Sequence, residues 1–233
     1  MAIAFDSANS GSGSAVSSLT VSVTTGAVSN ALAIAMTARG GSGTSVTGVT
    51  FNGTAMTSAG SITNVFTAYI WYLALGTISA GSKDCIVTLD STNGWIDAGV
   101  VVIAGADQSS PVDATQSLST GSANPSLTIT TVTDGAAIFD CISTNASANL
   151  AMNAQTNRVS VYVDSPVSGQ LDSAGGTRLI TKSPAGDQIL DWTQPAGGEE
   201  TAIFAAAFKP AAAAAAADTA FTSPIFRSRM REW

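Results

Sequence analysis

Short runs of alternating apolar and polar residues, separated by turn signals, fill residues 1–209. Leu19, Val21 and Val23 alternate with serine and threonine, a pattern typical of a strand with one face in solvent. Turn signals recur about every 8–12 residues, the spacing found in sandwiches and barrels. No part of this region combines a 3.6-residue period with helix caps. We therefore predict an all-β fold, an antiparallel β-sandwich of jelly-roll-like design followed by an extended C-terminal tail.

Other runs are apolar at every position. Ala31–Met36 and Ala98–Ala104 are of this kind, which favours interior strands buried on both faces. Asn52-Gly53 separates two strand-like runs, and this dipeptide suits a type I′ hairpin turn because both residues tolerate positive φ. In the run Phe66–Leu75 we place the aromatic side chains mainly in the core, with a sugar-stacking platform as the alternative. Those side chains are Tyr69, Trp71 and Tyr72.

One pattern occurs twice. Ser18–Gly26 and Ser126–Gly135 each read as a strand and a turn, each leads into a buried strand, and they lie 108 residues apart. Equivalent strands of two stacked sheets would produce this repeat. Chance similarity within sequence rich in serine and threonine would produce it as well, so both explanations stay open.

Charge is scarce and unevenly placed. Charged residues make up 11% of the chain, where about 25% is usual. Residues 1–209 hold six basic against fourteen acidic residues, which argues against nucleic acid as a partner because phosphate binding needs a basic surface. The N-terminus has no basic, apolar signal-like region, so we expect no secretory signal. No apolar run approaches ~18 residues, so we expect no membrane span.

The sequence offers little catalytic chemistry. Histidine is absent, which removes the Ser-His-Asp and Cys-His arrangements and the usual zinc ligands. No phosphate-binding loop or dinucleotide fingerprint occurs. We predict a protein without enzymatic activity, cofactor or metal. A carboxylate pair for glycoside hydrolysis remains open, and its candidates are Asp97, Asp107, Asp113, Glu199 and Glu200.

The sequence around both cysteines and around two of the four tryptophans indicates whether each side chain is buried. Cys85 and Cys141 sit in apolar, strand-like runs and are interpreted as buried thiols, although a disulfide would form if their strands adjoined. Trp95 follows Gly94, and Trp192 precedes a Pro/Gly loop. We interpret these two tryptophans as surface aromatics that could face a ligand.

Two polar segments resemble ligand loops. Asp90–Gly94 looks like a fragment of a calcium loop but lacks the further oxygen ligands and the distal glutamate, so we predict an Asx-type turn. Asp107–Asp113 follows a buried strand, and Pro111 fixes its path. We predict a structured turn there, with sugar or ion binding as the alternative.

The last residues differ in character from the body. We divide the chain into a sandwich domain (1–209), an alanine-rich linker (210–220) and a C-terminal docking peptide (221–233). The peptide is too short to bury its own apolar side chains, and tryptophan and arginine are typical anchors at interfaces. A disordered terminus is the alternative. The predicted docking residues are Phe221, Ile225, Phe226, Arg227, Arg229, Met230, Arg231 and Trp233.

Four stretches together carry a likeness to a known domain: Val46–Thr57, Tyr69–Leu73, Val102–Asp113 and Ala202–Pro210. They resemble an all-β domain that recurs in tailed-phage virion proteins and in some bacterial surface proteins. The resemblance covers nearly all of residues 1–210 and leaves out the docking peptide. It implies a structural or adhesive role and brings no catalytic residues with it.

These observations predict a virion structural protein of a tailed phage, assembled in the host cytoplasm. A capsid decoration (cement) or head-fibre protein anchored by its C-terminal segment is the first choice. The alternative is a carbohydrate- or receptor-binding module of a phage tail or neck, for which a glycan is the expected ligand. We expect other virion proteins, major capsid or neck and tail subunits, as partners. We also expect a homo-oligomer, for which the class of protein suggests a trimer, and neither nucleic acid nor membrane as a partner.

Overall fold

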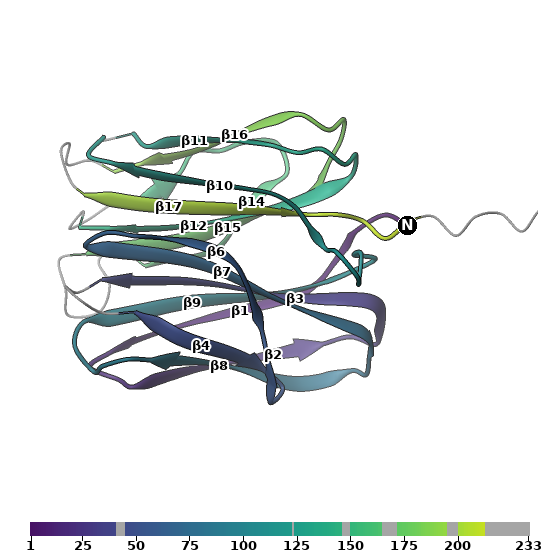
Figure 1. Cartoon of the computed structure of the whole chain (residues 1–233), viewed down its shortest axis with the longest axis horizontal. Helices are drawn as coiled ribbons and strands as arrows, with labels where there is room; N and C mark the ends of the chain where they lie inside the picture. The colour runs from purple at the N-terminus through teal and green to yellow at the C-terminus, as the bar shows by residue number, and fades with distance from the viewer. Residues whose placement is uncertain (41–44, 123, 146–149, 165–171, 195–199, 213–233) are drawn as a thin grey trace, which may run out of the picture.

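A computed structural model describes residues 1–40, 45–122, 124–145, 150–164, 172–194 and 200–212. The described residues form strands and turns without a helix, and their strands make four antiparallel sheets stacked in layers (Figure 1). The prediction of an all-β fold, an antiparallel β-sandwich, is confirmed.

The first half of the chain supplies two sheets. The inner one contains, in spatial order, β1 (Ala4–Ser14), β9 (Trp95–Ala104), β3 (Val28–Gly40), β7 (Phe66–Ile78) and β6 (Thr57–Thr63). The outer one contains β2 (Ser18–Thr25), β8 (Gly81–Leu89), β4 (Val46–Phe51) and β5 (Thr54–Ala55). At the β4–β5 turn both Asn52 (φ 49°) and Gly53 (φ 79°) have positive φ, which confirms the predicted hairpin.

The second half repeats this plan. Its inner sheet contains β10 (Val112–Thr120), β17 (Thr201–Phe208), β12 (Ala136–Thr144), β15 (Ser173–Lys182) and β14 (Arg158–Asp164). Its outer sheet contains β11 (Ser126–Thr130), β16 (Asp187–Thr193) and β13 (Ala151–Met152). If the five strands of each inner sheet are numbered by their order in the chain, the two sheets have the same spatial order of strands. The pattern repeated in the sequence corresponds to β2–β3 and β11–β12, which are equivalent strands of the two halves.

The two inner sheets face each other with their strand orders reversed. β3 packs on β12, while β1 lies over β14 and β6 lies over β10. The ends of β3 and β12 meet, since the Ser143 hydroxyl donates to the Arg39 carbonyl across 3.2 Å. These contacts are those of two halves related by an approximate two-fold rotation about an axis along the strands.

Three apolar layers separate the four sheets. In β3, the side chains of Leu32, Ile34 and Met36 point into the central layer between the halves, and the small Ala33 and Ala35 point into the first half's own core. β9 and β17 divide their side chains between two layers in the same way. The runs predicted to be buried on both faces are thus confirmed, and they lie in the interior of the stack.

Tyr162 of β14 joins the two halves. Its ring packs against Gly99 of β9 and Gly176 of β15, and its hydroxyl lies 3.2 Å from the Cys141 sulfur. The side chain is 8% exposed. Glycine at both positions is what allows a ring to fit between the two inner sheets.

Substituting Gly99 with alanine is therefore expected to destabilise the protein by about 1–3 kcal/mol, because the new methyl group overpacks this contact. The added carbon would lie 2.6 Å from the Tyr162 ring and 2.9 Å from Val161. Gly48→Ala is the matched control, since an added carbon there meets nothing within 4 Å. Urea unfolding of both variants measures the difference, and equal stabilities would contradict the proposed fit.

Candidate functional site

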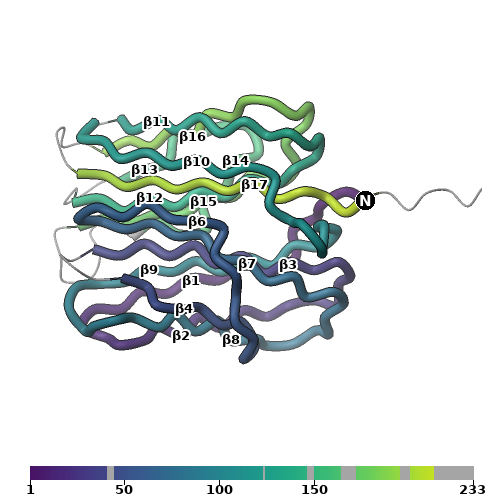
Figure 2. Tube along the Cα trace, in the orientation of Figure 1, coloured from purple at the N-terminus to yellow at the C-terminus, as the bar shows by residue number. Residues whose placement is uncertain are grey.

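Both ends of the described chain lie at one end of the body, which we call the tail pole (Figures 1 and 2). The Met1 ammonium donates to the Ala211 carbonyl across 2.5 Å, and the Ala211 N–H donates to the Gly105 carbonyl across 2.7 Å. Pro210 forms a β-bridge with Ala106. The chain therefore leaves the body beside Met1. The predicted docking residues, Phe221 to Trp233, lie outside the described residues.

A groove opens where an edge of one inner sheet lies over an edge of the other. Its cavity of about 220 Å³ is lined by Ser10, Gly11 and Ser12 of β1, Asp97 of β9, and Tyr162 and Val163 of β14. We call it the edge groove. Asp97 is 1% exposed, so the groove has a buried carboxylate in its lining.

The described lining of the edge groove contains two titratable side chains, those of Tyr162 and Asp97. Burial raises the pKa of Tyr162 well above its usual range, so this phenol stays protonated at neutral pH. Among the described residues that line the groove, Asp97 is the only carboxylate. Glycoside hydrolysis uses two carboxylates about 5–9.5 Å apart, and the described part of the lining supplies one.

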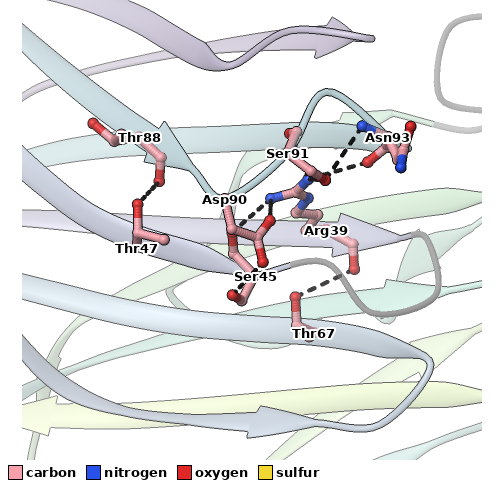
Figure 3. A network of polar contacts seen from close by, with 8 residues as sticks. All are labelled: Arg39, Ser45, Thr47, Thr67, Thr88, Asp90, Ser91 and Asn93. Carbon is pink, nitrogen blue, oxygen red and sulfur yellow. Dashed lines mark hydrogen bonds and ion pairs between the residues drawn. The ribbon is translucent and has the colours of Figure 1, made fainter.

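The Asp90–Gly94 segment surrounds a buried arginine (Figure 3). Arg39, 1% exposed, donates to the carbonyls of Ser45 (2.5 Å), Ser91 (2.9 Å) and Asn93 (3.0 Å) and to the Asp90 carboxylate (3.0 Å). Hydrogen bonds from Ser45, together with the Arg39 charge, lower the pKa of Asp90. The oxygen atoms that a calcium loop would offer to a cation instead accept hydrogen bonds from a guanidinium, which agrees with the prediction of a turn.

The Asp107–Asp113 loop is held by its own carboxylates. Asp107 accepts the N–H of Ser109 (2.8 Å) and of Ser110 (3.2 Å), and these bonds lower its pKa. Asp113 accepts the N–H of Val132 across 2.8 Å and the Thr133 hydroxyl across 2.6 Å. The prediction of a structured turn is confirmed. Both candidate carboxylates thus serve the loop, and Glu199 lies outside the described residues.

The interpretation of Trp95 and Trp192 as surface aromatics is wrong. Trp95 is 2% exposed and donates to Asp172 across 2.6 Å, and Trp192 is fully buried and donates to Asp140 across 2.7 Å. A buried indole N–H needs an acceptor, and both acceptors are distant in sequence. Adjacent turn residues therefore misled the sequence-based placement.

The aromatic residues of β7 and both cysteines lie in the packed layers. Tyr69 is buried, and Trp71 and Tyr72 are partly buried against the core, as predicted. Cys85 and Cys141 are free thiols in different apolar layers, which agrees with their interpretation as buried thiols rather than a disulfide.

A buried polar cluster in the second half was not anticipated. Asp140 of β12 accepts hydrogen bonds from Arg158 of β14 (2.9 Å), from Thr177 of β15 and from Trp192 of β16. The Arg158 guanidinium also lies 5.1 Å from the Trp192 ring centroid. A single aspartate inside the apolar run of β12 was the available signal, because a buried carboxylate requires donors. The cluster is closed by protein groups and connects four strands of two sheets.

Among the residues that the structure describes, no three or more His, Cys, Asp or Glu side chains gather where they could hold a metal ion. Within the same residues no helix is both long and apolar enough to cross a membrane. Comparisons with protein-family models, with curated proteins and with solved structures find no match to this chain.

Proposed function

We propose that this chain is a virion structural protein of a tailed phage, a capsid decoration (cement) or head-fibre protein anchored by residues 221–233. The observation that carries the proposal is the tail pole, where Ala211 leaves the body beside Met1. A peptide attached at one end of the stack of sheets holds the body by that end and leaves the opposite end free.

The body suits a passive, exposed role. Its interior strands are paired on both sides and buried on both faces, which protects the backbone against local opening. Few charges are present to attract unrelated partners. The anchor, in contrast, combines aromatic residues with Arg227, Arg229 and Arg231, the residue types that dominate binding energy at interfaces.

The alternative, a carbohydrate- or receptor-binding module, loses the two tryptophans proposed to face its ligand, because Trp95 and Trp192 are buried. We therefore prefer the anchored structural protein to the binding module. The cosedimentation experiment distinguishes the two.

The test is cosedimentation with particles of the phage that encodes the chain, prepared without this protein as separate capsids and tails. We expect the full chain to sediment with capsids and residues 1–212 to stay in solution, because truncation removes all five large apolar side chains and all three arginines of the anchor.

Circular dichroism of both proteins controls for folding of the truncated body. Sedimentation of the full chain with tails alone would transfer the proposal to the receptor-binding alternative. Equal sedimentation of both proteins with capsids would show that the body, and not residues 221–233, makes the attachment.

A further inference from the structure

The edge groove is bounded by two strands that each have one paired side within the described part of the chain. Among the described residues β1 pairs with β9 alone and β14 pairs with β15 alone. An edge strand presents free backbone N–H and C=O groups and is a template for a further strand. β14 is also apolar at its surface, with Val159 42% and Val163 41% exposed.

The edge groove has features that a basic strand would complement. Asp97 supplies a buried carboxylate, and the β1 side is built from serine and glycine, whose small side chains leave the backbone accessible. The body carries fourteen acidic residues against six basic ones. A positively charged, extended segment therefore meets favourable charge here.

The C-terminal segment has this character. Arg227, Arg229 and Arg231 alternate, so in an extended strand they share one face, and Phe226 and Met230 share the other. Arginine forms paired hydrogen bonds with a carboxylate and buries more readily than lysine. One face of such a strand suits Asp97, and the other suits exposed valine.

We propose that the edge groove receives residues 221–233 of a second copy of this chain as a strand added beside β14, with an arginine directed at Asp97. This inference rests on the proposed function, in which the same segment anchors the protein, and adds a sister subunit, beside the capsid, as a surface that the segment binds.

A second copy fits better than the same chain. β14 begins near the tail pole, because Arg158 pairs with Leu179 and the neighbouring Thr181 donates to the Ile3 carbonyl. A segment leaving that pole would run along its own β14 in the parallel direction, whereas every strand pair described is antiparallel. A subunit with the opposite orientation supplies an antiparallel strand, and residues 213–220 can span roughly 26 Å to reach it.

Light scattering after size exclusion of four full-length proteins tests the proposal. The proteins are the unaltered chain, Val163→Lys, Asp97→Asn and Ile189→Lys, which is the control because Ile189 is 49% exposed on an outer sheet. We expect the unaltered chain and the control to be oligomers, and both groove variants to dissociate at least about tenfold more readily.

Two results would overturn the proposal. If the unaltered chain is a monomer, residues 221–233 do not link two copies of the chain. Attachment to capsids is then decided by the cosedimentation experiment alone. If the chain is an oligomer that residues 1–212 cannot form, while both groove variants associate normally, the tail docks elsewhere and the anchoring role survives.

Disulfide cross-linking separates a second copy from the same chain. One full-length protein carries Val163→Cys and another carries Ser228→Cys, and the native cysteines do not compete because both are buried. Oxidation of the mixture is expected to give a linked heterodimer. A double variant that links only within its own chain, as a monomer, would overturn the proposal of a second copy.

Discussion

Replacing Asp140 with alanine is expected to lower the free energy of unfolding by about 3–5 kcal/mol, because it leaves a buried guanidinium without its counter-charge. Asp140 is 1% exposed and Arg158 is 4% exposed, and they are joined across 2.9 Å. Trp192 and Thr177 also lose the acceptor of their hydrogen bonds. The loss of one carboxylate thus affects three donors at a site that water does not reach.

Urea unfolding measures this effect, and two further variants interpret it. Asp187→Ala removes an exposed carboxylate that accepts the Thr130 hydroxyl, and should cost less than about 1 kcal/mol. The pair Asp140→Leu with Arg158→Met removes both charges and should recover much of the loss, because an apolar pair needs no compensation. A double variant no more stable than Asp140→Ala would contradict an origin in the unpaired charge.

Each half contains one buried arginine, and the two are used differently. Arg39 lies at the end of β3 and binds mainly carbonyl groups of neighbouring turns, so it fixes the loops at that end of the first half. Arg158 lies on edge strand β14 and binds a carboxylate on central strand β12. The approximate two-fold repeat therefore extends to the backbone and apolar layers, but not to the polar interior.

The sequence predicted the interior strands well and missed three of the four edges of the inner sheets. β3 and β9 are continuous apolar runs, because both of their faces are buried. The strands β1, β6 and β10 were missed, and all three are edges of inner sheets. These edge strands are partly solvated and consist largely of serine, glycine and threonine. Their alternating positions therefore differ little in hydropathy.

The candidate site was less predictable than the fold. The edge groove joins Ser10–Ser12 with Tyr162, residues about 150 positions apart, and no local pattern connects them. The polar cluster around Asp140 likewise draws on four strands. Such arrangements follow from how the sheets stack, and one strand's periodicity holds no information about its neighbour across a layer.

Raising the pH from about 9 to 12 is expected to destabilise the protein steeply. Burial raises the pKa of Cys85 and of Cys141 from 9.0 to about 12. In this window the unfolded chain has lost the thiol protons and the folded chain retains them. The free energy of unfolding therefore falls with pH, by roughly 1.4 kcal/mol per pH unit for each thiol. This contribution is complete below pH 9 and lost as the pH approaches 12. Burial also raises the pKa of Tyr162, which adds to the effect above pH 10.

Urea unfolding of the unaltered chain, Cys85→Ala and Cys141→Ala at several pH values measures this effect. Lysine and tyrosine titration is common to all three proteins, so differences in the pH dependence of their stability come from the thiols. Each variant starts from a lower stability because it creates a cavity, but its stability should fall less steeply between pH 9 and 12. The slope is the informative quantity, since a change of packing alone shifts the whole curve without altering its dependence on proton binding. Parallel curves for all three proteins would show that the folded thiols ionise like exposed ones, which contradicts their burial between the sheets.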